Sequence, residues 1–179
     1  MMKRLAIIAL IISTLSPVFC RAESVSITHD FQTLAGQSKI TINSPTNTIA
    51  TTAEVTYTCS GGANFYSDAN SFNKIAVFLD ASGEQVTTTQ IANLDSMLIY
   101  YYPTAEKGIN VSYSTDSISW KAATVVRYAN GVKTIKFPAV NDYYVRISRK
   151  SSDNVYVWQI KYYYIDLSDC PNCFIYKHP

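Results

Sequence analysis

Tyrosine is the residue type whose number and spacing in this sequence point most directly to binding chemistry. The chain of 179 residues holds 14 tyrosines, and several occur in runs at positions 100–102, 143–144 and 162–164. Consecutive residues of a β-strand point to opposite faces, so each run places at least one ring outside the core. With Tyr100, Tyr102, Tyr143, Tyr162 and Tyr164 directed inward, the rings predicted on the solvent side are Tyr101, Tyr144 and Tyr163.

Exposed rings that carry a hydroxyl suit stacking on the C–H face of a pyranose, and they equally suit contacts with another protein. Arg146 lies two residues from Tyr144 and shares its strand face, where a guanidinium can donate hydrogen bonds to sugar hydroxyls. We therefore predict a ligand site formed by Tyr101, Tyr144, Arg146 and Tyr163. The alternative is that loops or the segment "CFIY" near the C-terminus cover these rings.

The residues needed for catalysis are sparse. The two histidines, His29 and His178, form no metal-binding pair and no clear Ser/His/Asp arrangement. Most carboxylates lie in turn sequences, where capping of backbone N–H groups explains them. We predict no enzymatic activity. A structural calcium ion is the one cofactor considered, because "FYSDANS" and "SDN" supply Asp and Asn oxygens, but no ligands are assigned and local turn hydrogen bonds explain the same residues.

The first 22 residues have the pattern of a signal peptide. Lys3 and Arg4 precede a short apolar run, which is too short to span a bilayer, and Ala22 is suited to cleavage. This pattern predicts a protein that is secreted or held at the cell surface. Lipidation at Cys20 would add a membrane anchor, although the bulky Phe19 before it disfavours that reading.

Without the leader, three cysteines remain in a predicted oxidising compartment. Cys170 and Cys173, in "CPNC", are predicted to form a loop disulfide, which leaves Cys59 as a buried free thiol. A redox centre is the alternative, but it favours a first cysteine at a helix N-terminus, and nothing after Cys173 has a helical pattern. The charge balance becomes 12 basic against 13 acidic residues, with no basic stripe, so we expect no nucleic-acid partner.

Hydrophobic residues alternate with polar ones along almost the whole remaining chain. About ten short runs rich in Val, Ile, Thr and Tyr are separated by turn sequences such as "SGGAN" and "DASGE". This pattern predicts an all-β, antiparallel two-sheet jelly-roll β-sandwich over residues 23–167, followed by a tail at 168–179. Only residues 85–97 could hold a helical turn. The predicted core includes Ile75, Val77, Leu79, Val111, Tyr113, Trp120, Val145, Ile147, Trp158 and Ile160.

The stretch "GINVSYSTDSISW" at 108–120 predicts a hairpin, with Asp116 organising its turn. Trp120 then continues an apolar strand face and is predicted to lie in the core, with sugar stacking as the alternative. "VSYSTDSISW", the later "YYVRI" and the closing "VYVWQIKYYYI" resemble galactose-binding-like jelly rolls of the discoidin and carbohydrate-binding-module type, as found in small secreted bacterial proteins. The resemblance covers residues 72–167.

That resemblance implies a jelly roll whose loops at one end bind glycans or lipid headgroups, often with a structural calcium ion. Its matching positions, Tyr113, Ser114, Asp116, Trp120 and 144–147, are scaffold residues, and Ser117 replaces the usual glycine of the hairpin. Taken together, the sequence predicts a secreted non-catalytic module that binds a glycan or cell-surface polysaccharide. The alternative is a surface or adhesion protein that contacts other proteins through exposed aromatic residues.

Overall fold

The computed structural model describes residues 23–44, 47–68, 74–102, 108–150 and 152–166, with the side chain of Asp68 left out. The predicted leader, Cys20, Cys170 and Cys173 lie outside these residues. The signal peptide, the lipid anchor and the loop disulfide therefore stay predictions. Within the described ranges, no helix combines the length and apolar character needed to cross a membrane.

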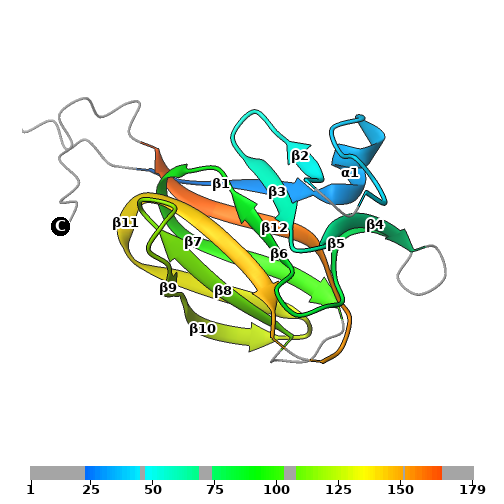
Figure 1. The fold of residues 1–179 in the computed structure, drawn as a ribbon. Helices are drawn as coiled ribbons and strands as arrows, with labels where there is room; N and C mark the ends of the chain where they lie inside the picture. Colours follow the sequence, from blue (N-terminus) through cyan, green and yellow to red (C-terminus); the bar gives the residue numbers. More distant parts are fainter. Residues whose placement is uncertain (1–22, 45–46, 69–73, 103–107, 151, 167–179) are drawn as a thin grey trace, which may run out of the picture.

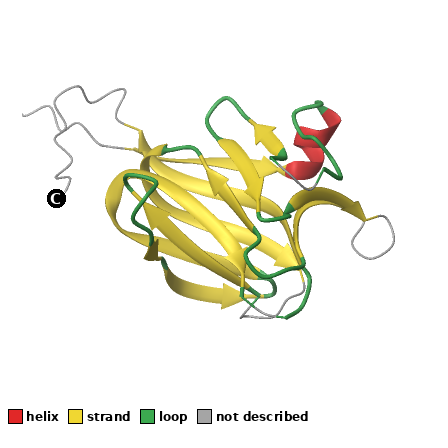
Figure 2. Cartoon of the chain, viewed as in Figure 1, coloured by secondary structure: helices red, strands yellow, loops and turns green. Residues whose placement is uncertain are grey.

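Strands make up most of the described chain, which confirms the all-β class (Figure 2). The strands are β1 (Glu23–Asp30), β2 (Ile49–Thr51), β3 (Thr56–Ser60), β4 (Asn64–Asp68), β5 (Lys74–Leu79), β6 (Gln85–Thr88), β7 (Ile91–Tyr102), β8 (Ile109–Ser114), β9 (Lys121–Ala122), β10 (Thr124–Ala129), β11 (Val132–Arg149) and β12 (Val155–Asp166).

The one described helix is α1 (Phe31–Gly36), which packs against β5 (Figure 1). The Oδ1 atom of Asp30 accepts a hydrogen bond from the Gln32 N–H at 2.9 Å and so caps the helix. Phe31 and Leu34 bury its apolar side. The expectation that any helical turn would fall within residues 85–97 is wrong, since β6 and β7 occupy that segment.

The strands pair in antiparallel order into two sheets that share β11 (Figure 1). Sheet A runs β4-β5-β12-β7-β11-β10, with β1 also paired to β12, and sheet B runs β2-β3-β6-β11-β8-β9. The register of β11 shifts between Lys136 and Tyr143, where the strand passes from sheet A to sheet B. Pro138 lies within this irregular stretch, a position where its missing N–H costs no ladder hydrogen bond.

The inner faces of both sheets bury one hydrophobic core. Tyr143, Val145 and Ile147 alternate inward along β11, in agreement with its period of two. Seven predicted core residues are confirmed as buried: Ile75, Val77, Leu79, Val111, Val145, Ile147 and Ile160. Tyr113 is half-buried and packs against the core. Cys59 is confirmed as a buried free thiol, and burial, with a smaller effect of the Glu84 charge, raises its pKa to about 12.

Trp158 is one of two predicted core residues that lie elsewhere. The β12 register shifts between Val157 and Gln159, so that Val157 and Ile160 both point inward and Trp158 stays on the outer face of sheet A. There the Lys74 ammonium lies 3.5 Å from the centroid of the Trp158 ring. A bulge of this kind exchanges the faces of the residues that follow it, and period-two reasoning does not anticipate it.

Candidate functional site

Aromatic side chains gather on the outer face of sheet A, across four neighbouring strands. Phe78 of β5 pairs with Tyr156 of β12, and Tyr156 pairs with Tyr102 of β7. Ring centroids lie 5.1 Å apart for Tyr66 and Phe78, 4.9 Å for Phe78 and Tyr156, and 6.4 Å for Tyr156 and Tyr102. These four rings therefore form a continuous row that crosses β4, β5, β12 and β7 (Figure 1).

A second pair of rings lies beside this row. The centroids of Tyr100 and Trp158 are 5.3 Å apart, and Lys74 covers the Trp158 ring as described above. All of these rings are half-buried except Tyr102, which is 44% exposed. We call Tyr66, Phe78, Tyr100, Tyr102, Tyr156 and Trp158 the aromatic face. Cross-strand contacts hold the rings in fixed positions, and an aromatic surface of this kind offers flat apolar area with hydroxyl groups at its rim.

The prediction that Tyr101 lies outside the core is wrong. Tyr101 is only 2% exposed, and its ring centroid lies 6.4 Å from that of Tyr128 and 5.8 Å from the Lys133 ammonium. The reason is the register of β7, in which Met97, Ile99 and Tyr101 all point inward. Tyr100 and Tyr102, predicted inside, are therefore the tyrosines of this run on the outer face.

The other predicted site residues are divided between the two sheets. Tyr163 lies on the outer face of sheet A, further along β12, with the Lys161 ammonium 5.2 Å from its ring centroid. Tyr144 and Arg146 lie on the outer face of sheet B, because they alternate with the buried Tyr143, Val145 and Ile147. Since both inner faces pack on one core, the two outer faces lie on opposite sides of the sandwich. The structure thus keeps Tyr144 and Arg146 together and separates them from Tyr163.

The prediction that Trp120 lies in the core is also wrong. The predicted hairpin exists, with Ser112 opposite Ala122, but Trp120 precedes β9 on the outer face of sheet B. The Arg146 guanidinium carbon lies 3.7 Å from the centroid of the Trp120 ring. The loop before it is held by Asp116, whose Oδ1 atom accepts hydrogen bonds from the Ile118 and Ser119 N–H groups at 2.8 Å each. The Trp120 indole N–H donates to the Ser117 carbonyl at 3.1 Å.

Metal-binding groups do not gather in the part of the chain that the structure describes. No group of three or more His, Cys, Asp or Glu side chains lies close enough there to hold an ion. Of the two calcium candidates, "SDN" at 152–154 is described, whereas residues 69–71 of "FYSDANS" lie outside the described residues.

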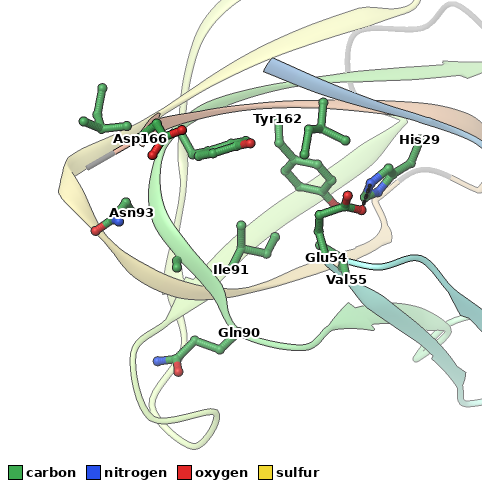
Figure 3. A pocket seen from close by; sticks show the side chains of 12 residues that line it. His29, Glu54, Val55, Gln90, Ile91, Asn93, Tyr162 and Asp166 are labelled. Carbon is green, nitrogen blue, oxygen red and sulfur yellow. Dashed lines mark ion pairs between the residues drawn. The ribbon is translucent and has the colours of Figure 1, made fainter. Parts of the chain in front are cut away.

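A pocket of about 350 Å³ opens between the sheets where β1 and β12 meet the start of β7 (Figure 3). Its apolar lining includes Ile27, Val55, Ile91 and Ile165. Tyrosine rings and polar side chains complete the lining, namely Tyr162, Tyr164, His29, Glu54, Gln90, Asn93 and Asp166.

A chain of polar contacts connects residues that line this pocket with the buried Tyr57. The Tyr162 hydroxyl lies 2.8 Å from the Tyr57 hydroxyl, which lies 2.5 Å from Nδ1 of His29. On its other side, Nε2 of His29 faces Oε2 of Glu54 at 3.5 Å, a long polar contact. A carboxylate only accepts, so the tautomer with a proton on Nε2 fits best. Tyr57 then donates to Nδ1, and Tyr162 donates to Tyr57.

The environment of this chain shifts several pKa values. Burial lowers the pKa of His29, although the Glu54 carboxylate opposes that effect. Burial also raises the pKa values of Tyr57 and Tyr162, so both stay neutral. For Glu54, desolvation works to raise the pKa, but hydrogen bonds from Thr52 and the backbone and the proximity of His29 outweigh it and lower the pKa. At neutral pH the pocket therefore holds a neutral imidazole beside an ionised carboxylate.

The lowered pKa of His29 predicts that acid destabilises the fold. Below the ordinary value of 6.5, the unfolded chain takes up a proton at this residue and the folded chain does not, so stability is lost as the pH falls from about 7 toward the lowered folded pKa. A His29→Gln variant should lose this share of the pH dependence. Thermal unfolding at pH 7 and pH 5.5 measures it, and an equal fall in Tm for both proteins would refute the assignment.

Comparisons with known proteins give distant structural similarity. No protein-family profile and no curated protein matches the sequence significantly. A family two carbohydrate esterase from Cellvibrio japonicus aligns with a TM-score of 0.41 and 12% identity, over 79% of this chain and 34% of the esterase chain. The K2 cleaved adhesin domain of Lys-gingipain aligns with a TM-score of 0.46 and 13% identity, over 77% of this chain and 99% of that domain. This chain spans about a third of the esterase chain. The likeness to galactose-binding-like domains stays a prediction.

Proposed function

We propose that this chain is a secreted, non-catalytic glycan-binding module and that the aromatic face of sheet A is its binding surface. The observation that carries the proposal is the unbroken row of rings from Tyr66 through Phe78 and Tyr156 to Tyr102. A linear glycan laid across the strands would meet one ring after another. Each ring offers an apolar surface to the C–H groups of a pyranose, and the tyrosine hydroxyls add hydrogen bonds at the edge.

Polar groups beside the rings favour a sugar over a purely apolar ligand. Asn64 lies opposite Phe78 and is half-buried with its Oδ1 atom inaccessible, so its amide NH2 group is the part that can donate hydrogen bonds. The ammonium groups of Lys74 and Lys161 lie over the Trp158 and Tyr163 rings and can donate to hydroxyls. Tyr163 of the predicted site lies on the same outer face of sheet A, further along β12, whereas Tyr144 and Arg146 lie on the outer face of sheet B.

The alternative, a surface or adhesion protein that contacts other proteins, is favoured by a different observation. Ile118, Val125 and Val126 are exposed large apolar residues close together in the chain. The two valines belong to β10, which lies at an edge of sheet A. Exposed apolar side chains on an edge strand are a common feature of protein contact sites.

A glycan array on the chain from residue 23 onward tests the glycan proposal. Tyr156→Ala removes one of the two inner rings of the row and is expected to weaken binding by about tenfold. Trp120→Ala is the matched control, because it removes a half-buried ring that stacks on a cation on the opposite outer face. Both variants should remain folded. Loss of binding in Trp120→Ala alone would move the site to sheet B, and an array without any bound glycan would reject the function.

A further inference from the structure

Positive charge lies beside two of the rings on the outer face of sheet A. The Lys74 ammonium lies 3.5 Å from the centroid of the Trp158 ring, and the Lys161 ammonium lies 5.2 Å from that of Tyr163. Among the side chains that the structure describes, neither lysine has an ion-pair partner. Each ammonium group carries three N–H donors, which remain available to an anion beside the ring.

A hollow on the same outer face extends this surface toward β10. Its volume is about 310 Å³, and its lining consists of Leu98, Arg127, Ala129, Asn130, Val132 and Thr134. Leu98 alternates with the buried Met97 and Ile99, which places the hollow on the outer side of the sheet. Val132 of β11 pairs with Tyr100 of the aromatic face. The hollow and the aromatic face therefore adjoin.

Arg127 is the one charged residue among the described residues that line the hollow. Its side chain is exposed and has no ion-pair partner within the described ranges. A guanidinium group binds a carboxylate through two parallel hydrogen bonds. Thr134 and Asn130 add a hydroxyl and an amide, which suit the hydroxyl groups of a sugar. A sugar that carries a carboxylate therefore fits this hollow better than a neutral sugar does.

The cations are too far apart to bind a single anionic group. In the sheet register Lys161 pairs with Leu98, Leu98 with Thr134, and Thr134 with Arg127. Neighbouring strands lie about 4.8 Å apart, so the backbones of Lys161 and Arg127 are about 14 Å apart. The Lys161 ammonium also lies by Tyr163 of its own strand. A chain of acidic sugars, in contrast, presents a separate anionic group to each cation.

Two acidic residues of this sheet have partners of their own. Asp95 of β7 forms an ion pair with Lys136, and Asp30 of β1 caps helix α1. Resting on the glycan-binding function proposed above, we propose that the ligand of this surface is an acidic glycan built of hexuronic acid units. The rings stack on the C–H faces of the sugars, and Lys74, Lys161 and Arg127 bind carboxylates along the chain.

Isothermal titration calorimetry with oligogalacturonate and with its fully methyl-esterified form tests the proposal. Esterification removes the charges and keeps the sugar rings. At low ionic strength the acid form should bind about tenfold more tightly than the ester, because it alone makes charged hydrogen bonds. Added salt should reduce this difference. Equal binding of the two forms, tighter binding of the ester, or no binding of either would overturn the acidic specificity.

Variants locate the charge that matters. Arg127→Gln should weaken binding of oligogalacturonate by about tenfold and leave binding of the ester unchanged, since the change removes an exposed charge. Lys121→Gln is the matched control, because it removes an exposed cation from β9 of sheet B, and it should leave both affinities unchanged. Equal losses in the two variants would mean that net charge alone acts, and would refute the hollow as part of the site.

Tyr156→Ala separates this inference from the proposed function. Removal of the ring should weaken binding of the acid and of the ester alike, because stacking does not depend on the charge. If the ester bound as tightly as the acid and Tyr156→Ala weakened both, the acidic specificity would be wrong and the aromatic face would remain the glycan site. An array on which no glycan binds, acidic or neutral, would reject the proposed function itself.

Discussion

Replacement of Tyr101 by alanine is expected to lower the free energy of unfolding by about 3–5 kcal/mol, the cost of removing a large buried side chain. The Tyr101 ring fills the core between Tyr128 and the buried Lys133. Its loss leaves a cavity next to a charged group whose ammonium donates to the Ile109 carbonyl at 2.6 Å. Urea denaturation measures the change.

Tyr102→Ala is the matched control for this experiment, since it removes the same side chain one residue away. Tyr102 is 44% exposed, and its removal is expected to cost about 1 kcal/mol or less. The pair tests the register of β7 directly. A larger loss of stability in Tyr102→Ala than in Tyr101→Ala would mean that the faces of this strand are assigned the wrong way round.

The second large effect is expected from Gly61→Ala, with a loss of about 2–4 kcal/mol. Gly61 has a φ of +72°, which a side chain disfavours, and a Cβ atom there would lie 2.4 Å from the Gly83 carbonyl oxygen. The β3–β4 turn and the β5–β6 turn therefore approach too closely for any residue but glycine. Because the first turn leads into β4, the substitution should also disturb Tyr66 and the aromatic face.

Gly36→Ala provides the control, because nothing lies within 4 Å of a Cβ atom placed there. At the end of α1 this change is expected to be neutral or stabilising by up to about 1 kcal/mol. Urea denaturation measures the free energy of unfolding of both variants. Equal stability of the Gly61 and Gly36 variants would contradict the close contact between the two turns.

Period-two alternation predicts much of this fold because most strands keep it. Ile75, Val77 and Leu79 follow it inward, and the same pattern places Phe78 outward, on the aromatic face. The alternation of hydrophobic and polar residues does not predict β-bulges. The shift at Trp158 and the irregular start of β7, where Asn93 has a φ of +50°, each exchange the faces of the residues that follow. The run "MLIYYY" is apolar throughout, so its composition does not select one face for Tyr101.

The positions of the candidate site residues depend on contacts between residues that are far apart in the sequence. Trp120 lies outside the core because of the conformation of the loop before it. Asp116 and the left-handed Ser117, with a φ of +61°, fix that conformation. The pocket depends on contacts between distant segments, since Tyr57 meets His29 at a separation of 28 residues and Tyr162 at a separation of 105. No sequence motif predicts either pairing. The runs of tyrosine indicated that some rings lie outside the core, and the bulges decide which rings these are.

Mapping of amide chemical shifts during titration with the best glycan from the array locates the binding surface. We expect the largest changes at Tyr66, Phe78, Tyr102 and Tyr156 and at their neighbours on β4, β5, β7 and β12. Residues around Trp120 and Arg146, on the opposite outer face, should not change. Changes centred on Trp120, Tyr144 and Arg146, with the aromatic face of sheet A unaffected, would contradict glycan binding at the aromatic face.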